Sequence, residues 1–241
     1  MILIEIGNSS VKAVKNDDGQ RSPLFKIGSD NIDGLRQEIT NIQKGETVVL
    51  SSVRRDLTEV VLEFSSRPQI QVIDKESLGN IKLDYKTPET LGIDRVLACA
   101  GGVSHSKSDV VVVDAGTACT IDFMSADYTF RGGVILPGLP VLRQSMRSLT
   151  PELPEVDQTL PDIFPGKSTT EAIQFGLNGG FLHAVSHFIG QYVSEHGDAK
   201  VMVTGGDGAF IQAKLEHIFG TDHFDNLVFD GMLAWKRING V

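Results

Sequence analysis

The chain has 241 residues, 41% of them hydrophobic and 22% charged, and a formal net charge of −9 at pH 7. This composition is typical of a folded globular protein and excludes extensive disorder. The acidic balance and the lack of a long basic run argue against nucleic-acid binding. No stretch approaches the roughly 20 apolar residues that a membrane helix needs, so we expect no membrane partner.

The two cysteines, Cys99 and Cys119, lie in apolar stretches of sequence. Such surroundings predict buried free thiols, which suit a reducing compartment. The first residues, Met1 to Glu5, lack a basic leader and are typical of a strand, not of a signal peptide. We therefore expect a cytoplasmic protein.

Short apolar strands alternate with helical stretches along the chain, and this alternation predicts an α/β fold. The strands are predicted at residues 2–6, 47–50, 71–73, 110–113 and 200–203. The helices are predicted near residues 31–43, 55–66 and 93–104.

Two of these strands begin a shared pattern at a constant offset of 109 residues. In each copy, an apolar strand leads into an acidic residue, a glycine and a small polar residue, and then into a second strand-like segment. The matching pairs are Glu5 and Asp114, Gly7 and Gly116, and Asn8 and Thr117. One such turn is common in proteins. Two copies with matching flanks predict a duplicated β-hairpin at the head of two related domains.

Residues 137–165 contain six of the nine prolines. Proline interrupts helices and central strands, so the segment is predicted to be a long, stiffened connection. Connections of this length usually serve as lids or binding elements. A long helix is predicted after Gly166, with Ser168 and Glu171 as a capping box. Gly176, Gly179 and Gly180 weaken this helix or allow close packing.

Glycine turns allow backbone amides to approach phosphate oxygens, and a nearby hydroxyl or carboxamide adds a hydrogen bond. Gly7-Asn8-Ser9 and Gly116-Thr117 supply both features, and Glu5 and Asp114 could orient a hydrated cation. Two facing hairpins of this kind would form a clamp for ATP. A third glycine turn, residues 204–208, follows a strand and is predicted to open a helix at Ala209, where nucleotides often bind.

Gly92-Ile93-Asp94-Arg95 places a carboxylate and a guanidinium at a predicted helix start. Asp94 could take the proton from an attacking hydroxyl, while Arg95 could pair with a substrate carboxylate or with phosphate oxygens. The nearby Arg95 also favours the ionised form that a base requires. The alternative interpretation makes Asp94 a helix cap and Arg95 a surface charge.

Two further patterns are weaker. Gly166-Lys167-Ser168-Thr169 resembles the end of a P-loop, but Pro161 stands where that motif needs glycine, and no strand is predicted before it. His183 and His187 share a helical face, but the glutamate of an HExxH motif is missing and no third ligand is evident. We expect neither a P-loop nor a metal site there.

Taken together in order, these motifs resemble type III pantothenate kinase, of the acetate-kinase, Hsp70 and actin superfamily. The matching segments span nearly the whole chain. They are Gly7-Asn8-Ser9, Tyr85, Gly92 to Arg95, Val113 to Thr117, Gly132-Gly133 through Pro137-Gly138, Gly166 to Thr169, and Thr204-Gly205-Gly206.

The resemblance implies two ribonuclease-H-like domains with an interdomain cleft, at residues 1–104 and 105–241, the second carrying dimerisation elements. It implies phosphorylation of pantothenate to 4'-phosphopantothenate, the first step of coenzyme A biosynthesis. It also implies ATP with Mg²⁺, a monovalent cation (K⁺ or NH₄⁺), and a homodimer with the substrate site near the subunit interface.

The resemblance also implies roles for single residues. Asp94 is similar to the general base, and Asp114 to the ligand of the monovalent cation. The implied substrate contacts are Tyr85, Gly92, Ile93, Asp94, Arg95 and Thr169. The implied ATP contacts are Glu5, Ile6, Gly7, Asn8, Ser9, Ser10, Val11, Lys12, Thr117, Gly205 and Gly206. The family usually has aspartate at the position of Glu5, so the longer stem could shift a bound cation or its water.

Other functions stay open at this point. The family includes proteins named as accessory factors for transcription, so a non-catalytic regulator is one alternative. A kinase for another small hydroxylated acid is a second. A nucleotide-dependent switch of the actin or Hsp70 type is a third, although this chain lacks the extra mass that those proteins use for partners.

Overall fold

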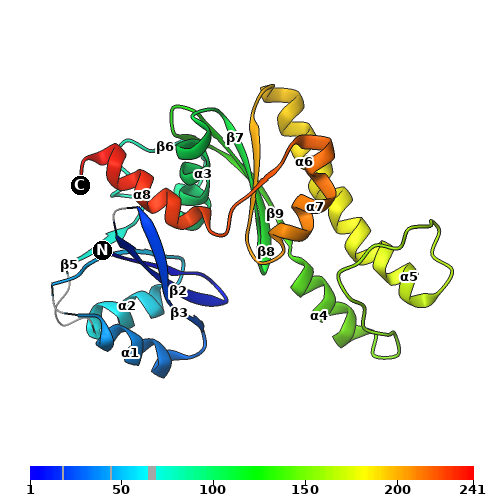
Figure 1. Ribbon diagram of the computed structural model, residues 1–241, viewed down its shortest axis with the longest axis horizontal. Helices are drawn as coiled ribbons and strands as arrows, with labels where there is room; N and C mark the ends of the chain where they lie inside the picture. Colours follow the sequence, from blue (N-terminus) through cyan, green and yellow to red (C-terminus); the bar gives the residue numbers. More distant parts are fainter. Residues whose placement is uncertain (18, 44, 65–68) are drawn as a thin grey trace. The chain divides into compact units, whose positions relative to one another are not determined.

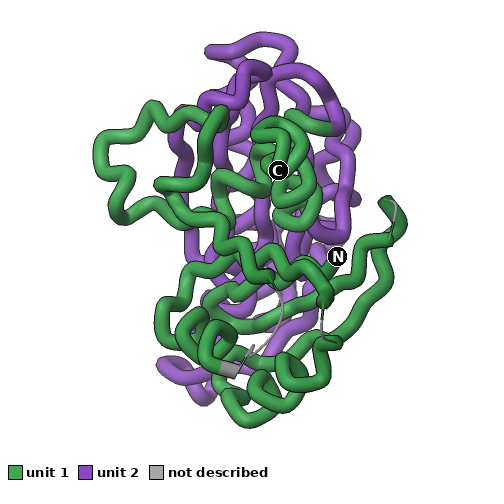
Figure 2. The backbone as a smooth tube through the Cα atoms, turned by 90° about the vertical axis from the view of Figure 1, so that its left-hand side faces the viewer, with its two compact units in different colours: residues 1–104, 227–241 green, residues 105–226 purple. Residues whose placement is uncertain are grey.

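The computed structural model describes residues 1–17, 19–43, 45–64 and 69–241. The chain divides into two compact units, which are coloured separately in Figure 2. Unit 1 comprises residues 1–104 and 227–241, and unit 2 comprises residues 105–226. Figure 1 labels the helices and many of the strands. Among the described residues, no helix is long and apolar enough to cross a membrane.

Unit 1 is built on a five-stranded sheet in the order β3-β2-β1-β4-β5. β1 pairs antiparallel with β2 and parallel with β4. The strands of this sheet are β1 (Ile2–Ile6), β2 (Ser10–Asp17), β3 (Gln20–Gly28), β4 (Thr47–Ser52) and β5 (Gln69–Ile73). The short β6 (Lys82–Leu83) also belongs to unit 1 but not to this sheet. The helices are α1 (Ile32–Asn41), α2 (Arg55–Phe64), the 3₁₀ helix η1 (Pro88–Thr90), α3 (Ile93–Ser106) and α8 (Leu227–Asn239).

Strand alternation sorts the side chains of unit 1 onto two faces of the sheet. On one face, Ile4 and Leu50 belong to a buried cluster with Leu35 of α1 and Leu57 of α2. Helix α8 also contacts β1. It is held to the rest of unit 1 by Trp235, whose indole Nε1 donates to the carbonyl oxygen of Ser77 at 2.8 Å. These contacts place the C-terminal helix in the unit that contains the N-terminus.

Unit 2 repeats this strand arrangement. Its five strands run in the order β11-β10-β7-β8-β9, with β7 antiparallel to β8 and parallel to β10. They are β7 (Val110–Ala115), β8 (Ala118–Ser125), β9 (Thr129–Pro137), β10 (Lys200–Thr204) and β11 (Asp222–His223). The helices are α4 (Leu139–Leu149), α5 (Thr169–Gln174), the π-helix η2 (Phe175–Gly179), α6 (Gly180–His196) and α7 (Gly208–Phe219). Side chains of α6 and α7 share one buried cluster with β7, β8 and β10.

The repeated topology confirms the predicted α/β class and the duplicated hairpin. The five predicted strands and three predicted helices are also present, although residues 65 and 66 of the second helix lie outside the described residues. The capping box is formed, because Glu171 N donates to Ser168 Oγ at 3.2 Å and Ser168 N donates to Glu171 Oε2 at 3.1 Å. Cys99 and Cys119 are free and buried, as expected.

The prediction for residues 137–165 is wrong in part, because α4 occupies residues 139–149 of this segment. Pro140 lies in the first turn of α4, where a backbone N–H would have no acceptor within the helix, so the missing N–H of proline costs no helical hydrogen bond. Residues 150–168 contain neither helix nor strand, as expected of a connection. The predicted second domain, 105–241, differs from unit 2 in its end, since residues 227–241 group with unit 1.

Candidate active site

The first predicted phosphate turn joins β1 to β2 in unit 1. Gly7 N donates to Ser10 O at 3.0 Å and closes the turn. Ser29, after β3, supports it twice: its Oγ donates to Asn8 O at 2.6 Å and its N donates to Ser9 O at 3.1 Å. Asn8 and Ser9 are exposed. The turn therefore presents a braced backbone with a carboxamide and a hydroxyl at the surface, which suits an anionic group.

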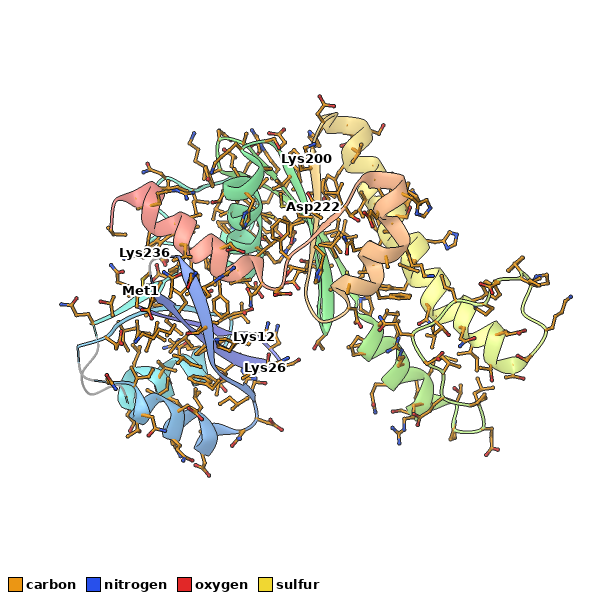
Figure 3. All side chains as sticks on the ribbon, in the orientation of Figure 1. Met1, Lys12, Lys26, Lys200, Asp222 and Lys236 are labelled. Atoms are coloured by element: carbon orange, nitrogen blue, oxygen red, sulfur yellow. The ribbon has the colours of Figure 1, made fainter. Side chains whose placement is uncertain are left out.

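Glu5 and Lys12 lie opposite each other in the β1–β2 register. Lys12 Nζ donates to Glu5 Oε2 at 3.3 Å, and Glu5 is only 8% exposed. Lys26 follows next in the same row on β3, and Figure 3 labels it beside Lys12. Lys12 thus offsets the charge of the buried Glu5 carboxylate. Lys12 and Lys26 place two ammonium groups in one row of the sheet, near the β1–β2 turn.

Asp94 occupies the second position of α3 and is half-buried. Its Oδ1 accepts a hydrogen bond from Arg95 N at 2.8 Å. A Cβ on Gly92 would come too close to this same oxygen, so glycine leaves room for the carboxylate to fold back over the chain, and a larger residue would force the carboxylate to shift. The predicted Gly92-Ile93-Asp94-Arg95 motif therefore has a specific geometry, in which Gly92 makes room for the Asp94 carboxylate.

Val53 connects this motif to the first turn within unit 1. Val53 N donates to Ile6 O at 3.0 Å, directly before Gly7. Val53 Cγ1 also lies 3.8 Å from the position that a Cβ on Gly92 would take. The structure therefore brings Asp94 and the β1–β2 turn to the same region of unit 1. The sequence did not single out Val53, because an apolar residue after a strand carries no distinctive signal.

The other predicted residues of unit 1 lie in two settings. Ile6, Val11, Ile93 and Arg95 are buried, and Tyr85, in the segment after β6, is half-buried. Burial of the Arg95 side chain excludes the alternative in which Arg95 is a surface charge. A guanidinium held in a buried setting suits recognition of a carboxylate or phosphate.

The second predicted turn joins β7 to β8 in unit 2. Gly116 N donates to Ala118 O at 3.1 Å, and Gly138 N donates to Thr117 O at 2.9 Å. The third glycine turn packs against the same place. Gly205 has a φ of +90°, and a Cβ there would lie 2.6 Å from both Asp114 Oδ1 and Ala115 O. Unit 2 thus brings Gly205 against Asp114, and Thr117 lies in the adjacent β7–β8 turn.

Carboxylates concentrate around this second turn. The pKa of the Cys119 thiol is raised, first by burial and then by the negative charges of Asp114, Asp122 and Asp207. A region of this charge, next to turn carbonyl oxygens, suits a cation. Among the described residues, no group of three or more histidine, cysteine, aspartate or glutamate side chains is arranged to hold a metal ion. A site here would therefore combine Asp114 with backbone carbonyl oxygens.

Thr169 is the first residue of α5 and is exposed. It follows the capping-box residue Ser168, so its position at the helix start is well defined. No strand precedes it within residues 150–168, in agreement with the rejection of a P-loop. His183 and His187 are exposed on α6, and a ring nitrogen of His183 lies 2.7 Å from Gly179 O.

Gln158 and Asp207 are contacts of the second site that the sequence did not indicate. Asp207 N donates to Ala115 O at 3.0 Å, and Gln158 Nε2 donates to Asp207 Oδ1 at 2.9 Å. Asp207 belongs to the predicted glycine turn, and its role there could have been suspected. Gln158 lies in the proline-rich connection, and nothing in its local sequence distinguishes it.

Comparisons with known proteins identify the family of this chain. The model of the type III pantothenate kinase family matches residues 1–191. A type III pantothenate kinase of Persephonella marina is 34% identical over 238 residues, covering 91% of this chain and 93% of that protein. One of Flavobacterium johnsoniae is 28% identical over 227 residues, with 93% of each chain covered.

Solved structures give the same fold. A protein of Campylobacter jejuni described as a Baf family transcriptional activator superposes with a TM-score of 0.71 at 25% identity, covering 100% of this chain and 99% of its own. A 2-dehydro-3-deoxygalactonokinase-like protein of Sinorhizobium meliloti, with 98% of each chain covered, has a TM-score of 0.59 at 11% identity and supports the fold alone. With the family match over residues 1–191, these findings show that the chain belongs to the type III pantothenate kinase family and has its two-domain ribonuclease-H-like fold.

Proposed function

We propose that this member of the family transfers the γ-phosphoryl group of ATP to a hydroxyl of pantothenate. The product is 4'-phosphopantothenate, and the reaction is the first step of coenzyme A biosynthesis. The observation that carries the proposal is the Gly92–Asp94 arrangement, in which glycine makes room for a carboxylate beside the buried Arg95. Asp94 accepts the hydroxyl proton as the oxygen attacks phosphorus, and ADP leaves.

We assign the pantothenate contacts to residues of both units. Tyr85, Gly92, Ile93 and Arg95 come from unit 1, and Thr169 comes from unit 2. The Arg95 guanidinium pairs with the pantothenate carboxylate, because a planar fork of donors matches two carboxylate oxygens. The exposed Thr169 hydroxyl is accessible for a contact with substrate.

ATP contacts are assigned to both hairpins. In unit 1 they are Glu5, Ile6, Gly7, Asn8, Ser9, Ser10, Val11 and Lys12, and in unit 2 they are Thr117, Gly205 and Gly206. The backbone amides at the turns receive phosphate oxygens, and Lys12 adds a positive charge. Because Glu5 is paired with Lys12, its main role is to hold that ammonium in place.

Two cations complete the proposed site. Mg²⁺ accompanies ATP and offsets the phosphate charge. The oxygen donors around Asp114 fit a monovalent cation, K⁺ or NH₄⁺, because such ions take carboxylate and carbonyl oxygens. Asp114 would hold this cation together with backbone oxygens of the β7–β8 turn.

We also propose a cytoplasmic homodimer. Unit 2 exposes large apolar side chains near Thr169, including Ile163 at 75% and Phe164 at 78%. Burial of such side chains against a second copy would be favourable. In such a dimer, the substrate site would lie near the subunit interface.

The test is ATP-dependent formation of 4'-phosphopantothenate, followed by mass spectrometry, in K⁺ and in Na⁺. Asp94→Asn is expected to lower kcat by about 10²- to 10⁴-fold, the range for loss of a general base. ATP affinity should change little. Asp33→Asn is a matched control, because Asp33 is also the second residue of a unit 1 helix and follows isoleucine, but its side chain is 96% exposed.

A folded protein that binds ATP but forms no product would contradict the kinase proposal. The regulatory function named for the Campylobacter jejuni protein would then be the next candidate. If another small hydroxylated acid were phosphorylated in place of pantothenate, the assignments of the base and of the ATP site would be kept, and only the identity of the phosphoryl acceptor would change.

A further inference from the structure

The connection at residues 157–159 is held by the α5–α6 region of unit 2. Asn178 lies in the π-helix η2 and is fully buried. Its Nδ2 donates to the carbonyl oxygens of Asp157 at 2.9 Å and of Thr159 at 2.7 Å. π-Turns inside helices often occur at functional sites, because they redirect a side chain. Here the π-turn directs an amide onto the proline-rich connection.

A second contact strengthens this attachment. Gln174 Nε2, at the end of α5, donates to Asp157 Oδ1 at 2.6 Å and to Thr159 Oγ1 at 2.7 Å. Hydrogen bonds from Thr159 and Gln174 lower the pKa of Asp157, because they stabilise its carboxylate form. Residues 157 and 159 are therefore fixed to the helical region that begins at Thr169.

Gln158, between them, contacts a different part of unit 2. Its Nε2 donates to Asp207 Oδ1 at 2.9 Å, and Gln158 is half-buried. Asp207 belongs to the third glycine turn, where its N donates to Ala115 O at 3.0 Å. Gly205 in the same turn packs against Asp114. Gln158 thus joins the connection to the turn that surrounds the proposed cation and phosphate site.

We propose that Gln158 is a positioning residue that holds the glycine turn of residues 204–207 for the nucleotide. This inference rests on the proposed function, in which Gly205 and Gly206 contact ATP. Residues 150–168 contain no helix or strand, so the placement of Gln158 depends on contacts such as those of Asn178 and Gln174. Through these contacts, the helix that begins at Thr169 and the nucleotide turn share one hydrogen-bonded connection.

The first test is Gln158→Ala, with Gln37→Ala on the exposed surface of α1 as the control. Loss of one hydrogen bond to a carboxylate is expected to raise the KM for ATP about three- to ten-fold. The kcat and the KM for pantothenate should stay within about two-fold of the wild type, because the chemical step is untouched. The thermal midpoint of both variants is measured alongside.

The second test exchanges donor and acceptor. Gln158→Glu places two carboxylates together and should raise the KM for ATP more than Gln158→Ala does. Asp207→Asn keeps a hydrogen bond, since the new amide oxygen can accept from Gln158. In the variant that combines Gln158→Glu with Asp207→Asn, the new amide at position 207 donates to the new carboxylate at position 158. The KM for ATP should then return to within about three-fold of the wild type.

Direct calorimetry with ATP keeps this inference separate from the proposed function. If the wild type binds ATP but makes no product, the kinase proposal fails, and the ATP Kd of each variant still tests Gln158. A wild-type Kd in Gln158→Ala would overturn the inference. So would a double variant no better than Gln158→Glu alone, or an Asp207→Asn as impaired as Gln158→Glu.

Discussion

The two hairpins share one pattern but differ by one residue in the turn. In unit 1, Ile6 pairs with Val11, so four residues form the turn, whereas in unit 2, Ala115 pairs with Cys119 across three. A change of one residue in a turn shifts the register that follows it. Glu5 therefore faces Lys12, while Asp114 faces Thr120.

This shift gives the two acidic residues, Glu5 and Asp114, different chemical surroundings. Glu5 forms an ion pair with the lysine opposite, and its charge is offset within the protein. Thr120, opposite Asp114, offers a hydroxyl. Two further carboxylates, of Asp122 and Asp207, lie close enough to raise the pKa of the Cys119 thiol. The first hairpin is therefore suited to present a positive charge to phosphate, and the second to attract a cation.

Among changes in the two hairpins, the largest expected effect comes from removing the acidic charge of the second hairpin. Asp114→Asn should lower kcat/KM by about 100-fold, because electrostatic stabilisation of the transferring phosphoryl group is lost. The difference between K⁺ and Na⁺ should disappear as well. Asp222→Asn, an exposed residue of unit 2 labelled in Figure 3, is the control. If Asp114→Asn remained more active in K⁺ than in Na⁺, Asp114 would not be the ligand of the cation.

A second experiment gives unit 2 the lysine of unit 1. Thr120→Lys places an ammonium opposite Asp114, as Lys12 stands opposite Glu5. The ratio of activities in K⁺ and Na⁺ should fall to about one, because a fixed positive charge replaces the mobile cation. Thr120→Met, similar in length to the lysine but uncharged, should keep the K⁺ response. Equal behaviour of the two variants would argue against an electrostatic cause.

A smaller effect is expected in the first hairpin. Glu5→Asp shortens the stem by one methylene and lengthens the contact with Lys12, so the KM for ATP should rise about three-fold. Lys12→Met should raise it about ten-fold. In a double-mutant cycle, the pair should show a coupling energy of about 0.5–1 kcal/mol, since Lys12 is partly exposed. Additive effects would mean that Glu5 does not position Lys12.

The smallest effect concerns the far end of the first hairpin, where Lys15 pairs with Glu46 at 3.2 Å. The hydrogen bond from Lys15 lowers the pKa of Glu46, and the same bond raises the pKa of Lys15. The stabilisation is present above the unfolded-state pKa of Glu46 and is lost as the pH falls through its folded-state pKa. It is likewise lost as the pH rises through the raised pKa of Lys15.

Glu46→Gln should therefore lower the Tm by about 2 °C or less at pH 7, because partly exposed ion pairs contribute little. The difference from the wild type should shrink as the pH falls below the unfolded-state pKa of glutamate, about 4.3, and vanish once the pH lies below the lowered folded-state pKa of Glu46. Thermal unfolding followed by circular dichroism at several pH values measures it. A difference that does not shrink as the pH falls would point to packing and not to charge.

Strand and turn residues with local signatures could be predicted. Apolar runs ending in an acid and a glycine indicated β1 and β7, and Ser168 with Glu171 indicated the start of α5. Helix α4 was missed because prolines stand on both sides of its eleven residues and a third, Pro140, lies within them. Pro140 does not interrupt the helix because it lies in the first turn, but the spacing of the prolines in the sequence did not reveal where the helix starts.

The α/β class, the duplicated hairpin, the family motifs and the glycine that accompanies Asp94 follow from the sequence, because each depends on residues close together in the chain. The pairing of Glu5 with a lysine and of Asp114 with a threonine required the folded structure, since a one-residue difference in turn length sets that register. The same holds for the contact of Gln158 with Asp207, 49 residues away, and for the packing of α8 in unit 1. These pairings arise from how distant segments pack, and no local pattern in the chain encodes them.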